Sequence, residues 1–269
     1  MSWLNKTLGS HKPVIAMAHL PPLPGAPLYD AKGGMDAVVD YVGRDLEALQ
    51  AAGVDCIMFG NEGDRPYRLE ASPESLAAMA AVVAALKGTL KVPFGVNYLW
   101  DPVATVALAV ATGAAFAREI FTGVYESDMG LWQPDAAKAV RLRHALGRDD
   151  LKLLFNINAE FAAPLGQRPI EARAKSAVFS SLADAVLVSG PMTGQPVDQS
   201  NLRRVKEAVG DTPVFANTGC TLDNIRDILA IADGCIVGTH FKVDGDTWKP
   251  VDRKRAERFM EVVRRVRQA

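Results

Sequence analysis

The chain has 269 residues, enough for one large domain or two small ones. Hydrophobic residues make up 49% of it, which supplies a sizeable core and excludes a disordered chain. Its 30 Lys and Arg residues balance 31 Asp and Glu residues and aromatic residues reach only 7%, so the composition disfavours nucleic acids and anionic membranes as partners.

Short apolar runs alternate along the chain with longer stretches whose apolar residues recur at helical spacing. In the first half, strands are predicted at residues 14–18, 54–59, 92–96 and 115–120. Helices are predicted between them at residues 35–52, 72–86 and 101–113. Gly53 follows the first helix as a C-cap, Ser72 precedes a proline as the N-cap of the second, and Asp101-Pro102 starts the third.

The second half repeats this alternation. Strands are predicted at residues 151–157, 185–188, 213–216 and 234–237. Helices are predicted at residues 133–146, 169–182, 198–209 and 221–230, and a closing amphipathic helix at 252–267. Eight strand–helix units, the first beginning near Val14, predict one (β/α)₈ TIM-barrel domain over residues 1–269, a length close to the roughly 250 that is typical of that fold. A doubly wound open sheet is the alternative, but no GxGxxG follows the first strand.

Cysteine usage and the N-terminus bear on the compartment. Cys56, Cys220 and Cys235 are odd in number and form no CxxC pair, which argues against a disulfide framework and a structural zinc site. Residues 1–10 lack the apolar centre of a signal peptide, and the longest apolar run, residues 103–117, is too short to span a bilayer. We therefore expect a cytoplasmic protein without a membrane span.

Polar residues follow nearly every predicted strand, at the barrel end where active sites lie. The candidate catalytic residues at these strand ends are His19, Glu62, Asn97, Arg118, Asn156, Asn158 and Glu160. His19 suits either acid–base catalysis or a structural hydrogen bond. Glu62 and Glu160 could act as general bases, bind a hard divalent ion or pair with Arg118. No motif predicts a metal site or an organic cofactor.

Glycine turns follow the last two strands, where many barrels of this kind bind phosphate. The candidate phosphate-binding residues in these turns and after the sixth strand are Ser189, Gly190, Gly219, Cys220, Thr221, Gly238 and Thr239. Turning the chain is the alternative role of the glycines. The proline-rich segment at residues 20–34 is expected to form a lid over the site, and docking to an SH3-like domain is its alternative.

Several segments together resemble the BtpA/SgcQ family of predicted TIM-barrel enzymes, over about residues 14–260. The segments that carry the resemblance are AHLPPLPGAP, NEGDRPY, GVNYLWD, TGVYESDMG and ADGCIVGTHFKVDG with PVDRKRAERFM. The resemblance implies a barrel that is often compared with phosphoribosylanthranilate isomerase, in a family named for a cyanobacterial factor of photosystem I accumulation. Other members lie among sugar-uptake and sugar-metabolism genes.

The family pattern features His19, residues 61–64, Asn97, Arg118, Gly219, Gly238 and Lys242. The fifth strand departs from it, because many relatives have an Asp, a His and a Lys-His pair in this segment. The matching positions here are Asn156, Asn158, Glu160 and Phe161, and Ile120 stands where relatives often carry Asn. These departures imply another substrate or the loss of a step.

The sequence therefore predicts an enzyme for a small phosphorylated, sugar-like metabolite. The expected chemistry is isomerisation, epimerisation or lyase cleavage, with a proton moved next to a carbonyl. A non-catalytic assembly or regulatory factor, as the family name suggests, is the alternative. A phosphorylated small molecule is the expected partner, and a homo-oligomer is expected from base rates alone.

Overall fold

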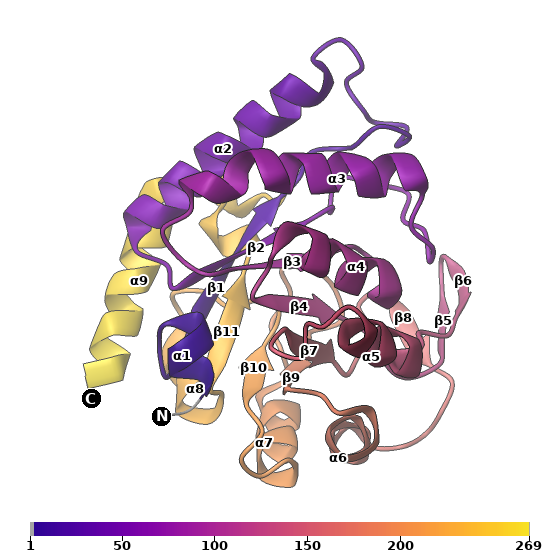
Figure 1. Cartoon of the computed structure of the whole chain (residues 1–269). Helices are drawn as coiled ribbons and strands as arrows, with labels where there is room; N and C mark the ends of the chain where they lie inside the picture. Colours follow the sequence, from indigo (N-terminus) through magenta and orange to yellow (C-terminus); the bar gives the residue numbers. More distant parts are fainter. Residues whose placement is uncertain (1–2, 269) are drawn as a thin grey trace.

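The computed structural model describes residues 3–268 and shows a closed barrel of eight parallel strands surrounded by helices (Figure 1). Around the barrel the strands follow the order β1, β11, β10, β9, β7, β4, β3, β2. Their bounds are β1 Val14–His19, β2 Cys56–Gly60, β3 Phe94–Asn97, β4 Phe116–Glu119, β7 Lys152–Asn156, β9 Ala185–Val188, β10 Val214–Ala216 and β11 Gly234–Val237. The predicted (β/α)₈ fold is confirmed.

Helices follow the strands in the predicted alternation. Their bounds are α2 Gly34–Ala52, α3 Pro73–Leu86, α4 Pro102–Thr112, α5 Ala136–Ala145, α6 Ile170–Ser181, α7 Gln199–Ala208, α8 Ile225–Ile231 and α9 Arg253–Gln268, with short 3₁₀ turns η1 Lys87–Thr89, η2 Thr239–Phe241 and η3 Val243–Gly245. Two helices begin later than predicted. Helix α5 begins after Asp135, whose side chain accepts from the N–H of Lys138, and α8 begins only after Asn224.

The two predicted helix caps, Gly53 and Ser72, are present, and Asp101 forms a third cap. Gly53 ends α2 in the left-handed conformation (φ 78°), which favours glycine. Ser72 caps α3, and its hydroxyl accepts from the N–H of Ser75. The carboxylate of Asp101 accepts from the N–H groups of Val103 and Ala104 at the start of α4. These caps satisfy backbone groups that a helix end otherwise leaves unpaired.

Replacing Asp101 with Ala is expected to lower the free energy of unfolding by about 1 kcal/mol, the typical value of an N-cap. The second carboxylate oxygen of Asp101 also accepts from the N–H of Ala71, so the loss extends to the neighbouring loop. Urea denaturation measures the change. Asp101→Asn, which keeps an acceptor, is the control and should retain most of the stability; equal losses in both variants would contradict the capping role.

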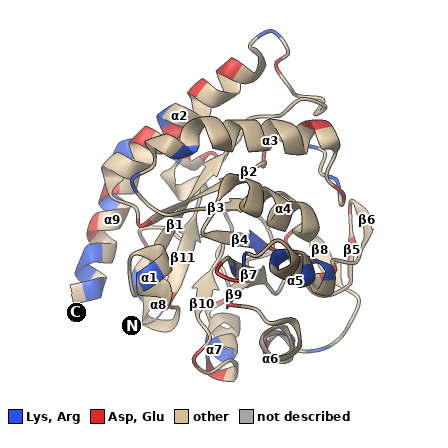
Figure 2. Cartoon of the chain, viewed as in Figure 1, with Lys and Arg blue, Asp and Glu red and all other residues tan. Residues whose placement is uncertain are grey.

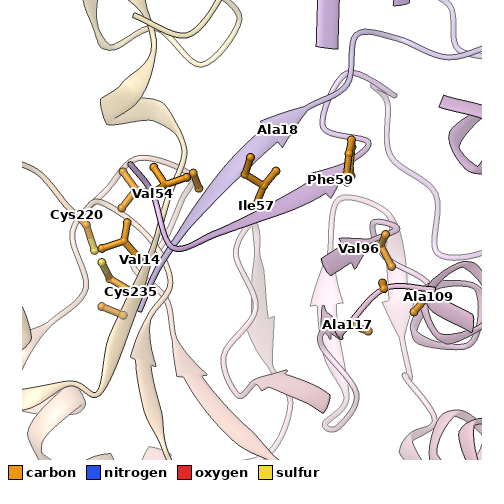
Figure 3. Close-up of a cluster of buried hydrophobic side chains, with 14 of the residues drawn as sticks. Val14, Ala18, Val54, Ile57, Phe59, Val96, Ala109, Ala117, Cys220 and Cys235 are labelled. Atoms are coloured by element: carbon orange, nitrogen blue, oxygen red, sulfur yellow. The ribbon is translucent and has the colours of Figure 1, made fainter. Parts of the chain in front are cut away.

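The strands are buried on both faces. Residues that point outward, among them Ala18, Ile57, Val96 and Ala117, pack against the helices (Figure 3). Residues that point inward form a second apolar cluster, which Leu4 and Leu8 join from the short helix α1 (Trp3–Leu8). Helix α1 was not predicted; it closes the end of the barrel where the strands begin (Figure 1).

A small antiparallel sheet, also not predicted, lies beside the barrel. Its strands are β5 Tyr125–Ser127, β6 Gly130–Trp132 and β8 Ala162–Pro164, in the order β6, β5, β8. The first two strands follow β4, and β8 follows β7. The sheet therefore joins two loops at the end of the barrel where the strands finish.

The proline-rich segment at residues 20–34 is fixed to the next loop along the barrel. The N–H of Leu23 donates to Asp64 at 2.7 Å, and the N–H of Gly63 donates to the carbonyl of Leu20 at 3.1 Å. Leu23 is fully buried. None of these fifteen residues lines the main cavity in the described structure, so this segment is not the lid that we expected.

Charged residues gather on the outer helices α2 and α9, whereas most of the barrel strands carry none (Figure 2). This distribution is the one that a sheet buried on both faces requires. Within residues 3–268, none of the helices combines the length and the apolar character that crossing a bilayer requires.

Candidate functional site

The inward side chains of the barrel form layers, and these layers change from apolar to polar at the strand ends. Side chains alternate along a strand, so every second residue points inward. The last apolar layer contains Met17, Met58, Phe116, Leu154, Leu187, Phe215 and Ile236. Two residues further along each strand, the residues again point inward and form what we call the floor layer. It consists of His19, Gly60, Asn97, Arg118, Asn156, Ser189, Asn217 and Gly238. Every residue of the floor layer is polar or glycine.

A cavity of about 270 Å³ lies on this floor layer. This volume is near the lower end of small-molecule pockets, which run from roughly 300 to 1,000 Å³, so the cavity suits a compact ligand. Nine of the predicted site residues line the cavity: His19, Glu62, Arg118, Glu160, Gly219, Cys220, Thr221, Gly238 and Thr239. The other five, Asn97, Asn156, Asn158, Ser189 and Gly190, lie behind its lining.

Arg118 is buried with a carboxylate and an amide as partners. One terminal nitrogen lies 3.7 Å from Glu160 Oε1, and the other donates to Asn97 Oδ1 at 2.5 Å. The amide of Asn97 in turn donates to Glu119 Oε2. Burial raises the pKa of Glu119 to about 8, although Arg118 opposes the rise. The predicted anionic partner of Arg118 is therefore Glu160, and Asn97 fixes the direction of the guanidinium.

Glu160 is surrounded by hydrogen-bond donors. Its Oε1 accepts from Asn217 at 3.3 Å and from Ser189 at 3.4 Å, and its Oε2 accepts from Thr193 at 2.8 Å. Burial raises the pKa of Glu160, and Arg118, Thr193 and Ser189 oppose that effect. A carboxylate held by so many donors is fixed in place, which suits it to orient Arg118.

Asn156 and Asn158 act on Ser189 from behind the cavity. The amide of Asn156 donates to the Ser189 hydroxyl at 2.9 Å. Asn158 pairs with the backbone of Ser189 in both directions, since its amide donates to the carbonyl and its oxygen accepts from the N–H. These contacts place both asparagines as supports for the hydroxyl that donates to Glu160.

Glu62 has a different environment from Glu160. Its Oε1 lies 3.7 Å from His19 Nε2, and its Oε2 is buried without a hydrogen-bond partner among the described residues. Burial raises the pKa of Glu62 to about 7, with Arg118 limiting the rise. Burial, together with the positive charge of Lys242, places the pKa of His19 well below its ordinary value. His19 is therefore neutral near pH 7, where Glu62 can exchange a proton.

The turns after β10 and β11 leave backbone donors free. Gly219, Cys220, Gly238 and Thr239 line the cavity, and within residues 3–268 their N–H groups have no acceptor. Free N–H groups beside a cavity are suited to bind an anion. Two details correct the prediction for these turns, one about α8 and one about Cys220, and a third adds a reason for the glycines.

The first correction is that no helix begins directly after Gly219. Helix α8 begins at Ile225, and the N–H of Thr221 already donates to Asn224 Oδ1 at 2.8 Å. The second is that the Cys220 thiol belongs to the apolar core beside Cys235, so only the backbone of Cys220 is available to a ligand (Figure 3).

The third detail is a steric reason for the glycines, in addition to the left-handed conformation of Gly219 (φ 62°), which suits a turn. A Cβ on Gly219 would lie 2.3 Å from the backbone of Gln195, and one on Gly238 would lie 2.9 Å from the His19 ring. A Cβ on Gly190 would likewise lie 2.4 Å from the carbonyl oxygen of Gln195. These glycines make room for their neighbours, whatever the turns bind.

Sequence reasoning missed several residues of the cavity. Arg255 reaches it from α9, donates its Nε to the carbonyl of His240 at 2.9 Å and has no carboxylate partner in the described chain. Tyr67 and Trp100 also line it. The alternation of side chains along β10 could have predicted Asn217, because it follows the inward-pointing Phe215 by two residues. Arg255 gave no such signal, since α9 has the pattern of an ordinary amphipathic surface helix.

Buried polar atoms without partners gather at this cavity. Among the described residues, these atoms include His19 Nδ1, Glu62 Oε2, Trp100 Nε1, Asn217 Oδ1 and His240 Nε2. Unpaired buried polar groups are costly, so such a concentration makes this cavity the candidate site for a polar ligand. In the same part of the chain, His, Cys, Asp and Glu side chains form no group of three or more that could hold a metal ion.

Comparison of the solved structures shows the same fold in phosphoribosyl anthranilate isomerase from Thermus thermophilus. That structure matches with a TM-score of 0.56 over 94% of this chain and 98% of the other, at 13% sequence identity. At this identity the likeness concerns the fold alone.

Sequence comparison gives much closer relatives. SgcQ, an sgc region protein of Escherichia coli strain K12, is 49% identical over 267 residues, which cover 99% of this chain and 100% of SgcQ. The photosystem I biogenesis protein BtpA of Synechocystis sp. PCC 6803 is 32% identical, over 97% of this chain and 91% of BtpA. The model of the BtpA family matches residues 10–265, which confirms the resemblance. The chain belongs to the BtpA family.

Proposed function

We propose that this protein is an enzyme that moves a proton on a small phosphorylated metabolite, in an isomerase or lyase reaction. The observation that carries the proposal is Glu62, a buried carboxyl group in the cavity with one unpartnered oxygen and a pKa of about 7. A general base works best when its pKa is near the working pH. Glu160 is the weaker candidate, because four side chains already occupy its oxygens.

Arg118 would stabilise the negative charge that develops on the substrate oxygen. Its guanidinium lines the cavity and is held by Asn97 and Glu160, so it does not have to reorganise during the reaction. His19 is neutral beside Glu62 and could donate a hydrogen bond to the same substrate or accept one from it. The residues present therefore supply a base, a neutral imidazole and a fixed cation around one small space.

The phosphate would bind at the anion end of the cavity, which we define as Gly219, Cys220, Gly238, Thr239 and Arg255. The four backbone N–H groups supply directed donors, and Arg255 supplies positive charge. Arginine is well suited to phosphate because its planar fork can bind two oxygens at once. The free guanidinium nitrogens of Arg255 have no carboxylate partner among residues 3–268.

Replacing Arg255 with Gln is expected to weaken the binding of inorganic phosphate by roughly 10- to 100-fold, since hydrogen bonds to a charged group contribute about 1.5–3 kcal/mol. Isothermal titration calorimetry measures the affinity. Arg253→Gln is the matched control on the same helix, because Arg253 is exposed and pairs with Glu257 at 2.7 Å. Equal affinities for phosphate in the Arg255 variant and the wild type would remove Arg255 from the site.

A thermal-shift screen of phosphorylated sugars and nucleotides, with and without Mg²⁺, tests the function and identifies a substrate for assay. A ligand that binds only the folded state raises the melting temperature. A hit that is then converted to product supports the enzyme. A ligand that binds tightly and is never converted would instead support a non-catalytic role, as the name of the Synechocystis relative suggests.

A further inference from the structure

The cavity has two unlike sides, and the barrel topology places them opposite each other. The anion end follows β10 and β11, whereas Trp100 follows β3 and Tyr67 follows β2. In the closed ring of eight strands, β3 lies four places from β10. The residues after β3 therefore face the anion end across the mouth of the barrel.

Leu99 and Trp100, which follow β3 opposite β10, belong to one apolar cluster with Tyr67 and Phe161, and we define these four residues as the aromatic wall. All four residues line the cavity. The hydroxyl of Tyr67 is already used, because it donates to the carbonyl of Glu62 at 3.1 Å. Leu99 and Phe161 have no polar side-chain atom. Apart from the indole N–H of Trp100, which has no partner among the described residues, the wall therefore offers ring faces and apolar surface to a ligand.

Trp100 is held rigidly from behind by the small antiparallel sheet. Its ring lies edge to face with Trp132 at 5.3 Å between centroids, and Trp132 contacts Tyr125 at 5.4 Å. Tyr67 also lies 5.8 Å from Trp100, edge to face. A ring that is fixed before binding loses little freedom when a ligand stacks on it. The small sheet thus serves to build this wall.

We propose that the natural ligand carries a flat ring at the end opposite its phosphate, and that this ring packs against the aromatic wall. The inference rests on the proposed function, since it assumes that a phosphate occupies the anion end. A sugar phosphate without a ring substituent would turn several hydroxyl groups toward a wall in which, among the described residues, the indole N–H of Trp100 is the one unpaired side-chain donor, which is unfavourable. A planar ring instead gains burial and stacking with aromatic side chains.

Three probes test the inference in the wild-type protein. Inorganic phosphate reports the anion end alone, phenyl phosphate adds a ring, and ribose 5-phosphate adds a sugar of similar size. We expect phenyl phosphate to bind at least tenfold more tightly than either of the other two, measured by isothermal titration calorimetry. Ribose 5-phosphate that binds as tightly as phenyl phosphate would overturn the inference.

Substitutions of Trp100 locate the effect. Trp100→Leu should abolish the advantage of phenyl phosphate and leave the affinity for inorganic phosphate unchanged, whereas Trp100→Phe should retain most of that advantage. Trp248→Phe is the matched control, because Trp248 is half exposed, packs against Arg65 and does not line the cavity in the described structure. Measuring inorganic phosphate in every variant also shows that each one is folded.

The outcomes separate this inference from the proposed function. If inorganic phosphate binds and phenyl phosphate gains nothing, the ring is wrong and the phosphate site stands. If the wild type binds neither probe, the ring and the phosphate part of the proposed function both fail. If phenyl phosphate binds more tightly and Trp100→Leu keeps the gain, the ring binds elsewhere and the aromatic wall is not its site.

Discussion

Replacing Glu62 with Gln is expected to lower kcat by about 10²- to 10⁴-fold, the usual contribution of a general base. The amide keeps the size of the side chain and removes its ability to take a proton. In the wild type, kcat/KM should fall as the pH drops below about 7, because burial raises the pKa of Glu62 to about 7 and only the ionised form is a base. The measurement is a turnover assay with the substrate that the ligand screen identifies.

Glu126→Gln is the control for this experiment. Glu126 lies on β5, is exposed and does not line the cavity in the described structure, so its variant should retain wild-type turnover. Retention of the affinity for inorganic phosphate by the Glu62 variant would show that its cavity is intact. Wild-type turnover in the Glu62 variant would instead assign the proton transfer to another residue.

The second large effect is expected on stability, from a buried ion pair beside the anion end. Lys242 Nζ lies 2.6 Å from Asp45 Oδ2, and both side chains are almost completely buried. Lys242→Met leaves the carboxylate of Asp45 buried without its cation, which should lower the free energy of unfolding by about 3–5 kcal/mol. Urea denaturation measures the change. Because Lys242 directly follows the η2 turn, the affinity for inorganic phosphate should fall as well.

Two controls define the cause of that loss. The double variant Asp45→Leu with Lys242→Met removes both charges and should regain much of the stability, because an apolar pair avoids the buried charge. The N–H of Val251, which donates to Asp45 Oδ1 at 2.7 Å, stays unpaired and limits the recovery. Lys249→Met removes an exposed partner of Asp244 and should leave the denaturation midpoint almost unchanged. A Lys242 variant as stable as the wild type would contradict the role of the pair.

The fold could be predicted because the barrel has strong local signals. Strands that are buried on both faces appear as continuous apolar runs, and residues such as Gly53 and Asp101 mark helix ends by the chemistry of their backbone groups. Active-site residues of such barrels lie where the parallel strands end. Nine of the residues predicted on this basis line one cavity. Both kinds of signal depend only on neighbouring residues in the chain and on the symmetry of the barrel.

The remaining features depend on contacts between distant segments. The difference between Glu62 and Glu160 arises from Thr193 and Asn217, which surround only the second carboxylate. The aromatic wall depends on a sheet of three-residue strands, too short to give a pattern. Arg255 comes from the last helix, where one basic residue among many turns toward the cavity.

The most direct test of the account is the ionisation of Glu62 itself. NMR titration of the protein with ¹³C-labelled Glu side chains, assigned by comparison with the Glu62→Gln variant, measures this pKa without any substrate. We expect a value of about 7, the result of burial in the cavity. A value near that of an exposed Glu side chain, about 4.3, would contradict it and leave the cavity without its proposed base.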